Sequence, residues 1–314
     1  MPKRSILVTG SSGMIGSALV EQLLDAGHDV HGIDLRPNRW SNRVDNVTKE
    51  CNLLEGNELS HLPKDIEIVV HLAANARVHR LVQNPRKARD NFEMTYNLLE
   101  YIRESDINGV IFGSSREVYG NGKNIVYTET DTHIDECESP YTASKVGGEA
   151  LLKSYHQCYD IDVSILRFSN VYGRYDISDR VIPLFIAQAA DNQNLTVYGE
   201  QKVLDFTHLD DCVNGIDQVI DQFNKAKGEI FNIASGTGSS LVEVAEKISE
   251  RLSDDPSITV ENNRTGEVAR YIADITKAEK VLGYEPAYML SDGLETAIDW
   301  YMQNDQYFDN ILDR

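Results

Sequence analysis

Three evenly spaced glycines follow the first apolar run of this 314-residue chain. Residues 5–9 are typical of a buried strand, Gly10, Gly13 and Gly16 come next, and residues 14–26 have the apolar spacing of a helix that stops at Gly27. Glycines between a strand and a helix permit a tight turn and let backbone N–H groups approach a pyrophosphate at the positive helix end. A glycine-rich turn alone can be merely structural, but the strand–turn–helix context predicts a dinucleotide site.

Strand and helix patterns alternate through the first half of the chain. Further strands are predicted at residues 29–34, 66–72, 110–113 and 161–168, with helices over residues 85–104 and from Pro140 onward. Such alternation means a parallel sheet with helices on both faces, and cofactors bind at the carboxyl ends of its strands. We therefore predict an α/β fold with a Rossmann-like, doubly wound parallel sheet.

The regular alternation of strand and helix patterns ends after Asn170. Short strands are predicted at residues 195–198 and 203–207, and helices at residues 211–223, 241–252 and 290–301. This pattern indicates a smaller, mixed α/β substrate lobe. We expect residues 1–169 to form an NAD-binding Rossmann domain to which residues 204–235 return, and residues 170–203 and 236–314 to form the substrate-binding lobe.

Composition excludes several classes of protein. The formal net charge is −20, whereas nucleic-acid binding needs a basic face, so we expect no nucleic-acid partner. The acidic surface favours solubility, and adaptation to high salt is a second interpretation. No apolar stretch approaches the roughly 20 residues of a membrane helix, and the first residues lack the pattern of a signal peptide, which predicts a cytoplasmic protein without membrane contact.

The cysteines and histidines predict neither a disulfide framework nor a metal site. The four cysteines are scattered without a Cys-x-x-Cys pair. His71 and His79 lie near each other, but no further ligands follow at metal spacing, so His71 is interpreted as structural.

Asp34 ends the second predicted strand, about twenty residues after the glycines. A carboxylate there can accept the adenosine ribose hydroxyls and would repel a 2′-phosphate, which favours NAD over NADP. Arg36 leaves NADP as an alternative, because an arginine can hold that phosphate.

Tyr141 and Lys145 are four residues apart on the helix that Pro140 opens, so they share one face. A nearby ammonium favours phenolate and is expected to lower the tyrosine pKa, which would make Tyr141 a base that works near neutral pH. Such pairs also arise by chance. Hydride chemistry is suggested by the combination of a nucleotide site, the Ser114-Ser115 hydroxyls and a tyrosine whose pKa its neighbours can shift.

The chain resembles the extended short-chain dehydrogenases/reductases along nearly its whole length. It is most similar to their nucleotide-sugar epimerase/dehydratase branch, and within it to the UDP-glucose 4-epimerase type. The motifs that carry this resemblance are Gly10-x-x-Gly13-x-x-Gly16, His71-Leu72-Ala73-Ala74, Ser114-Ser115, Val118-Tyr119-Gly120, Tyr141-x-x-x-Lys145, Arg167-Phe168-Ser169-Asn170-Val171-Tyr172-Gly173, Asp205-Phe206 and Arg264-x-Gly266-Glu267-Val268.

The resemblance implies three catalytic residues, bound NAD and a UDP-sugar substrate. Tyr141 would take the proton from the sugar 4-hydroxyl, Ser115 would hydrogen-bond the same hydroxyl, and Lys145 would bind the nicotinamide ribose. A 4-keto sugar would form, turn over and be reduced from its other face, so that NAD is regenerated. A homodimer is also expected from the resemblance.

Further contacts follow from the same resemblance. Asn170 and Arg264 match positions that contact the nucleotide diphosphate, Asn91 matches a helix residue that supports the site, and Asn52 stands where an aspartate often meets the adenine. The complete set of expected cofactor-binding residues is Gly10, Ser12, Gly13, Met14, Ile15, Gly16, Asp34, Asn52, Leu53, Leu72, Ala73, Ala74, Asn91, Tyr141 and Lys145.

Besides Asn52, the chain departs from the family pattern at two places. In 4,6-dehydratases the positions of Arg116-Glu117 resemble Asp-Glu, and an arginine cannot act as the acid that removes water. UDP-glucuronate decarboxylases also carry a glutamate at the position of Glu117, so a decarboxylase or a uronate epimerase stays open, and Glu117 is kept as a substrate-binding residue. It can also be a bystander paired with Arg116. Leu204 replaces an arginine that usually grips the diphosphate, and we propose Arg180 as its substitute, with Arg174 nearby.

The sequence thus predicts a UDP-sugar 4-epimerase, with UDP-glucose and UDP-galactose as the leading substrates. A UDP-glucuronate 4-epimerase or decarboxylase is the alternative. A hypothesis from another class is a catalytically silent NAD-sensing regulator on the same fold. Such a regulator would be expected to lack one or more of Ser115, Tyr141 and Lys145, but all three residues are present here.

Overall fold

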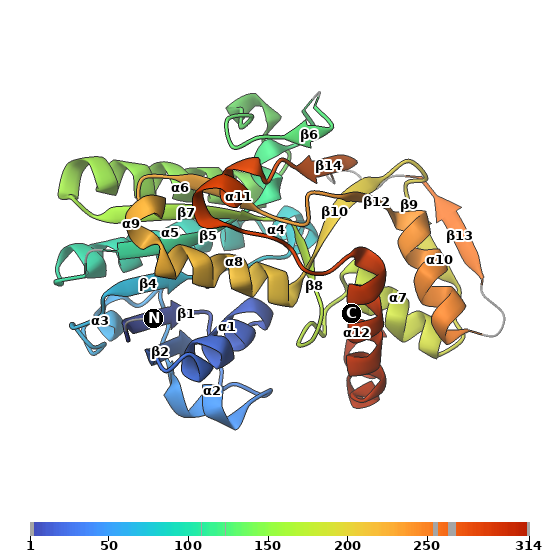
Figure 1. Ribbon diagram of the computed structural model, residues 1–314, viewed down its shortest axis with the longest axis horizontal. Coiled ribbons are helices and arrows are strands. Elements are labelled where there is room, and N and C mark those ends of the chain that lie inside the picture. Colours follow the sequence, from blue (N-terminus) through green and yellow to red (C-terminus); the bar gives the residue numbers. More distant parts are fainter. Residues whose placement is uncertain (1–2, 108, 123, 254–256, 263–267, 313–314) are drawn as a thin grey trace.

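The computed structural model describes residues 3–107, 109–122, 124–253, 257–262 and 268–312. Its largest element is a seven-stranded, all-parallel sheet with the strand order β11-β7-β5-β4-β1-β2-β3 (Figure 1). The strands of this sheet are β1 (Ser5–Thr9), β2 (Asp29–Asp34), β3 (Thr48–Glu50), β4 (Ile68–His71), β5 (Gly109–Ser115), β7 (Asp162–Phe168) and β11 (Ile230–Ile233).

Successive strand residues point to opposite faces of the sheet, and each face has its own hydrophobic core. Ile6 and Val8 pack with α1 (Met14–Asp25) and α8 (Leu209–Asp221), whereas Leu7 between them packs in the core of α5 (Arg86–Arg103) and α6 (Pro140–Tyr159). Figure 1 shows α1 and α8 together on one side of the sheet. Burying each such side chain contributes about 1.5–3 kcal/mol to folding, which explains the continuous apolar runs in the strands.

The order of the strands reverses beside β1. The chain runs from β1 outward to β2 and β3, then crosses back to β4 and continues the other way. In open α/β sheets the crevice at such a reversal is where ligands bind. The glycine turn lies at the carboxyl end of β1, so the topology directs it into this crevice.

Gly10 and Gly16 are required by the geometry of that turn. Gly10 has a φ of +72°, which side chains rarely allow. A Cβ on Gly16 would stand 2.0 Å from the Gly10 carbonyl oxygen. The close approach of α1 to the turn therefore depends on the absence of both side chains.

A smaller lobe covers one end of the large sheet and has its own hydrophobic core. Its main sheet has the order β12-β10-β14-β6, with β8 also paired to β10, and β13 pairs with β9. These strands are β6 (Val126–Tyr127), β8 (Asn170–Tyr172), β9 (Leu195–Tyr198), β10 (Val203–His208), β12 (Gly238–Ser240), β13 (Ile258–Glu261) and β14 (Arg270–Ala273). The longer helices of the lobe are α7 (Val181–Ala190), α10 (Leu241–Leu252) and α12 (Leu290–Met302).

Short helices complete the chain. They are α2 (Asn42–Val47), α3 (Gly56–Leu59), α4 (Val78–Gln83), α9 (Phe223–Ala226), α11 (Thr276–Leu282), α13 (Phe308–Leu312), η1 (Arg116–Tyr119), η2 (Ile134–Glu136) and η3 (Asp305–Tyr307). Across the described residues, no helix combines the length and the apolar character needed to cross a membrane.

An aromatic cluster joins the lobe to the large sheet. Trp40, from the loop after β2, stacks on Tyr175 with ring centroids 5.3 Å apart, and it meets the edges of Trp300 and Tyr307 at 5.9 and 5.2 Å. Aromatic pairs add about 0.5–1.5 kcal/mol beyond the area that they bury. These contacts hold the two parts of the molecule against each other beside the crevice.

Most elements of the large sheet match the sequence prediction, including the doubly wound parallel topology. The helix α7 was not predicted, because its sequence is apolar on nearly every side and contains Pro183, which hides the 3.6-residue period. The segment from residue 204 onward divides between the two parts. Strand β10 lies in the smaller sheet, whereas α8 packs on α1 and β11 joins the edge of the large sheet.

Candidate active site

A cavity of about 510 Å³ lies at the carboxyl end of the large sheet, where the lobe covers it. The glycine turn, the end of β5 and the first turns of α6 form one side of it. Residues of β8, α7 and β10 form the other side. The cavity thus brings the glycine motif near the start of the chain together with Ser115, Tyr141 and Lys145 from its middle.

The glycine turn leaves backbone donors available at the start of α1. Gly13 is the N-cap residue and supplies no side-chain hydrogen bond to the first turn of the helix. Met14, Ile15 and Gly16 follow and line the cavity. Helix N-termini with uncapped N–H groups favour anions, and a side chain at Gly16 would collide with the Gly10 carbonyl and so disrupt the turn. The turn therefore fits the pyrophosphate of a dinucleotide.

Asp34 lies at the end of β2 next to this turn. Its carboxylate accepts hydrogen bonds from the backbone N–H groups of Ser12 and Arg36, both at 3.1 Å. Burial raises the pKa of Asp34, and these backbone hydrogen bonds oppose that rise. The Ser12 hydroxyl donates to the Arg36 carbonyl, so Ser12 ties the glycine turn to the loop after Asp34.

The segment after β4 forms the opposite wall of the crevice. Leu72 and Ala74 line the cavity, and the Ala73 N–H donates to the Thr9 hydroxyl at 3.1 Å. His71 contacts Thr9 at 2.8 Å and Thr95 at 3.2 Å, and burial lowers its pKa to about 3. His71 is therefore a neutral structural residue, as the sequence indicated.

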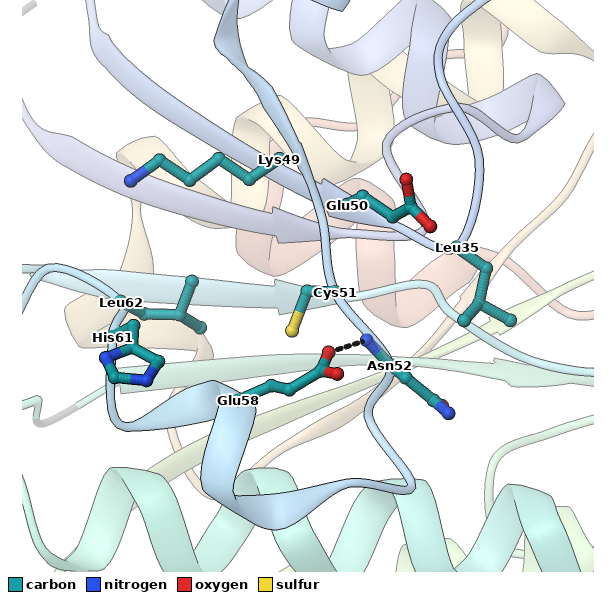
Figure 2. A pocket seen from close by; sticks show the side chains of 8 residues that line it. All are labelled: Leu35, Lys49, Glu50, Cys51, Asn52, Glu58, His61 and Leu62. Atoms are coloured by element: carbon teal, nitrogen blue, oxygen red, sulfur yellow. Dashed lines mark hydrogen bonds between the residues drawn. The ribbon is translucent and has the colours of Figure 1, made fainter.

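A second cavity, of about 390 Å³, lies beside β3 and is lined by Asn52 and Leu35 among others (Figure 2). The Asn52 backbone N–H donates to Oε2 of Glu58 at 2.6 Å, which fixes this loop. The Leu53 side chain is buried in the core of the large sheet. A contact of Asn52 with adenine stays a prediction, and any contact of Leu53 with the cofactor would have to use its backbone.

Ser115 and Tyr141 meet across the cavity wall. Ser115 is the last residue of β5, and its hydroxyl accepts the Glu117 N–H at 3.2 Å as the chain turns into η1. Tyr141 is in the first turn of α6, which Ser139 caps by accepting the Thr142 N–H at 3.1 Å. Both side chains line the cavity, and the Ser115 hydroxyl is near enough to the Tyr141 phenol to lower its pKa.

The pKa of Tyr141 is raised, not lowered as the sequence led us to expect. Burial raises the pKa of Tyr141, while the hydrogen bond from Ser115 and the charges of Arg180 and Arg116 lower it only in part. The Lys145 ammonium instead donates to the Gly113 carbonyl at 2.7 Å. The spacing correctly placed both residues on one helix face, but it could not reveal the desolvation of the phenol.

Lys145 is itself fully buried in an environment that disfavours its charge. Burial lowers the pKa of Lys145 to about 8, and the carboxylate of Glu149 opposes this fall. Glu149 accepts a hydrogen bond from Ser114 at 2.6 Å and pairs with Arg167 through both carboxylate oxygens, at 3.0 and 2.7 Å.

Asn91 supports the site from α5 rather than lining the cavity. Its side chain donates to the Ser144 hydroxyl at 3.2 Å, and Ser144 donates to the Tyr141 carbonyl at 2.7 Å. Asn91 also exchanges hydrogen bonds with the backbone of Asn75 at 2.7 and 3.1 Å. It thereby links the loop after β4 to the helix that carries Tyr141.

Of the residues expected to bind the substrate, Ser115, Glu117, Asn170 and Arg180 all line the cavity. Asn170 and Glu117 line the cavity, and Arg116 bridges them through bonds of 3.1 Å to Asn170 and 2.9 Å to Glu117. Arg264 falls outside the described residues.

Arg180 and Arg174 have different positions. Arg180 precedes α7, lines the cavity, is 42% exposed and has Asp176 at 3.7 Å. Arg174 pairs with Asp210 and lies over the Tyr175 ring at 5.4 Å, so Arg180 is the better placed of the two to meet a ligand. Leu204 is buried in the cavity wall and offers no donor.

Three further cations line the cavity that sequence reasoning missed, namely Arg77, Arg80 and Lys202. Lys202 is buried and directly precedes β10, two residues before Leu204. That spacing was the signal available for Lys202. Arg77 pairs with Asp179 at 2.8 Å, and burial lowers the pKa of Arg77 to about 10. Nothing in the local sequence around Arg77 pointed to the cavity.

Comparisons with known proteins agree with this geometry. The model of the NAD dependent epimerase/dehydratase family matches residues 6–234. A structure of UDP-glucose 4-epimerase from Thermotoga maritima with UDP-glucose has a TM-score of 0.87 and 28% identity, covering 96% of this chain and 99% of that one.

Two other solved structures are equally similar. The dTDP-glucose 4,6-dehydratase DesIV from Streptomyces venezuelae, with NAD bound, has a TM-score of 0.89 and 29% identity, covering 98% of this chain and 99% of that one. The UDP-glucuronic acid 4-epimerase from Bacillus cereus, with UDP-glucuronic acid and NAD, has a TM-score of 0.87 and 29% identity. The match covers 96% of this chain and 99% of that one.

The chain belongs to the NAD dependent epimerase/dehydratase family. It is therefore an enzyme of a family that uses NAD, and structural neighbours contain this cofactor. The glycine cradle and the uncapped start of α1 fit such a group.

The position of Asp34 gives a test of cofactor selection. Replacing Asp34 by serine should weaken NADH binding roughly tenfold, because a charged acceptor for the ribose hydroxyls is lost. NADPH should lose less, because the repulsion of its 2′-phosphate is lost as well. Fluorescence titration with both nucleotides measures the two affinities. Asp25→Ser, which alters an exposed carboxylate paired with Arg43, is the control. An unchanged NADH-to-NADPH ratio in Asp34→Ser would contradict the assignment.

Proposed function

We propose that this member of the NAD dependent epimerase/dehydratase family inverts C4 of a UDP-hexose through a 4-keto intermediate, with UDP-glucose and UDP-galactose as the leading pair. The observation that carries the proposal is that Ser115 and the buried Tyr141 and Lys145 line the same cavity as the glycine turn. A solved structural neighbour that is a UDP-glucose 4-epimerase supports the same reaction.

The proton moves through residues of this chain. Tyr141 takes the proton of the sugar 4-hydroxyl and returns it after the sugar has turned over, and Ser115 holds the same hydroxyl and the phenol in line. The glycine turn and Lys145 would hold NAD, which would supply the hydride acceptor and donor that inversion at C4 requires. No net oxidation occurs, so the reaction needs no second substrate.

The charges around Tyr141 are suited to both directions of proton transfer. Burial raises the pKa of Tyr141 and Glu117 raises it further, whereas Ser115, Arg180 and Arg116 lower it. The phenol can therefore act as an acid in one half of the cycle. The two arginines stabilise the phenolate in the other half.

Arg116 argues against the dehydratase reaction of other family members. The guanidinium stays protonated and cannot give a proton to a leaving hydroxyl. It also pairs with Glu117 at 2.9 Å, so the two residues form an ion pair rather than an acid and a base.

The cavity attracts anions although the protein is strongly acidic. Its lining includes six lysines and arginines but only three carboxylates, Glu117, Asp176 and Asp179, whereas the whole chain has 30 basic and 50 acidic residues. Basic groups gathered in a cleft raise the local concentration of an anionic ligand. This distribution favours a nucleoside-diphosphate substrate.

A UDP-glucuronate is the second candidate substrate, for epimerisation or decarboxylation. The excess of cations in the cavity and the structural neighbour that binds UDP-glucuronic acid both favour it. The silent regulator is less well supported, because Ser115, Tyr141 and Lys145 are all present in the same cavity.

We also expect a homodimer, formed through α5 and α6. Phe92 and Tyr96 on α5 and Tyr159 at the end of α6 are large apolar side chains that are 41–52% exposed. Leu152 of α6 is instead buried in the core of the subunit, so it is not available for such a contact.

Replacing Tyr141 by phenylalanine should lower turnover by roughly 10²–10⁴-fold, the range for loss of a general acid–base group. Bound NAD should remain, because the ring and the glycine turn are kept. Proton NMR of UDP-glucose and the absorbance of the released cofactor measure the two quantities. Tyr159→Phe, a change to an exposed tyrosine, is the control, and near-normal turnover in Tyr141→Phe would remove Tyr141 as the base.

Replacing Arg180 by alanine should weaken UDP-sugar binding by roughly tenfold, because a charged donor to the diphosphate is lost. NAD content should change little. Isothermal titration calorimetry with UDP-glucose measures the affinity, and Arg43→Ala, which breaks an exposed ion pair with Asp25, is the control. If the affinity of Arg180→Ala is unchanged, another cation such as Lys202 replaces the arginine missing at Leu204.

A further inference from the structure

The segment 174–180, which joins β8 to α7, is attached to the large sheet at two points. Tyr175 stacks on Trp40, which lies in the loop after β2, with ring centroids 5.3 Å apart. Asp179 pairs with Arg77, which lies in the loop after β4, at 2.8 Å. The segment therefore reaches from one of these loops to the other.

The order of the strands places the glycine turn between the two attachment points. Strands β2 and β4 are the two neighbours of β1, and the glycine turn follows β1. Because neighbouring strands lie about 4.8 Å apart, β2 and β4 are separated by about 10 Å. The chain from Tyr175 to Asp179 reaches at most about 14 Å when extended, so it is long enough to cross in front of the turn. Asp176, Asp179 and Arg180 of the segment line the same cavity as the turn.

The middle of the segment is held by the smaller lobe instead. Ile177 is buried in the hydrophobic core of the lobe, and the Tyr301 hydroxyl of α12 donates to the Asp176 carbonyl at 2.5 Å. A movement of the segment together with the lobe would keep these contacts and break those that Tyr175 and Asp179 make with the large sheet.

The backbone of Tyr175 is strained in the observed position. Its φ is +70°, in the left-handed region that a bulky side chain rarely adopts. Such a conformation persists only where the surroundings hold it, and it is common in segments that switch between two positions. Here the Trp40 stack and the Tyr175 hydroxyl, which donates to Glu21 of α1 at 3.0 Å, hold it. Loss of these contacts would let the backbone relax, which favours a second, open position.

The Arg77–Asp179 ion pair is the weaker of the two attachments. The two side chains are 22% and 38% exposed, and ion pairs with this access to water contribute little to stability. Such a pair can bias the position of the segment and still open readily.

We propose that residues 174–180 form a strap that crosses over bound NAD, and that the Arg77–Asp179 ion pair is the latch that must open before NAD enters or leaves. The inference rests on the use of NAD by the family and not on the sugar substrate. Arg77 and Asp179 are thus positioning residues that act on the cofactor through the strap.

Two simpler roles for the pair predict the opposite effect on NAD release. If Asp179 only repelled the cofactor phosphates, its neutralisation would slow the release of an anionic dinucleotide. If Arg77 only attracted those phosphates, neutralising Asp179 would strengthen the attraction and slow the release as well. A latch instead predicts faster release when the pair is broken.

The test measures NADH release by stopped-flow fluorescence. Protein saturated with NADH is mixed with excess NAD, and the loss of energy transfer from tryptophan to NADH reports the release. Both tryptophans of the chain, Trp40 and Trp300, contact the Tyr175 ring, so the donors lie beside the strap.

Asp179→Asn should release NADH roughly two- to fivefold faster, because the carboxylate of the ion pair is lost while the size of the side chain is kept. The association rate constant should rise by a similar factor, since the strap controls passage in both directions, so the dissociation constant should change less than either rate constant. Asp162→Asn, which breaks a partly exposed ion pair with Lys227 outside the cavity, is the control and should leave both rate constants unchanged.

The charge-swapped double variant, Arg77→Asp with Asp179→Arg, restores an ion pair in the reverse order and should return the release rate close to that of the unaltered protein. Thermal unfolding checks that each variant folds, and the isosteric Asp179→Asn decides by the direction of its effect if the double variant does not fold. Unchanged or slower release in Asp179→Asn, fast release from a folded double variant, or no binding of NADH by the unaltered protein would overturn the inference. No sugar takes part in these measurements, so their outcome is separate from that of the proposed C4 inversion.

Discussion

The attachment of α6 to the end of β5 is the interaction on which the site depends. Glu149 of α6 accepts from Ser114 of β5 and pairs with Arg167 of the neighbouring strand β7, and the Lys145 ammonium donates to the Gly113 carbonyl of β5. All of these groups are buried. Removing one partner of a buried ion pair commonly costs about 3–5 kcal/mol. Because Ser115 ends that strand and Tyr141 begins that helix, these bonds fix the distance between the two proposed catalytic groups.

The electrostatics of the cavity differ from those of the molecular surface. Carboxylates dominate the chain, yet cations outnumber carboxylates in the cavity lining. Two of those cations have close carboxylate partners, Arg77 with Asp179 at 2.8 Å and Arg116 with Glu117 at 2.9 Å. The remaining excess of positive charge suits the diphosphate of a nucleotide sugar.

Local pattern predicted the large sheet and the arrangement of the motifs, because strand runs, the glycine turn and the Tyr141–Lys145 spacing are properties of neighbouring residues. It missed α7, whose apolar sequence has no clear period. It assigned residues 204–235 as one segment to the Rossmann domain, whereas β10 of that segment pairs in the smaller sheet and β11 in the large one. It could not reveal the raised pKa of Tyr141, because desolvation comes from residues distant in sequence. Lys202 could have been predicted from its position two residues before Leu204, whereas Arg77 enters the cavity only through tertiary packing.

The most direct test of C4 inversion is proton NMR of the purified protein with UDP-glucose and NAD, combined with mass spectrometry of the sugar nucleotide. A second tube contains UDP-glucuronate. The account predicts a new anomeric signal at unchanged mass in the UDP-glucose tube, and less conversion in the other. An unaltered spectrum, or a product that has lost the mass of water or carbon dioxide, would contradict it.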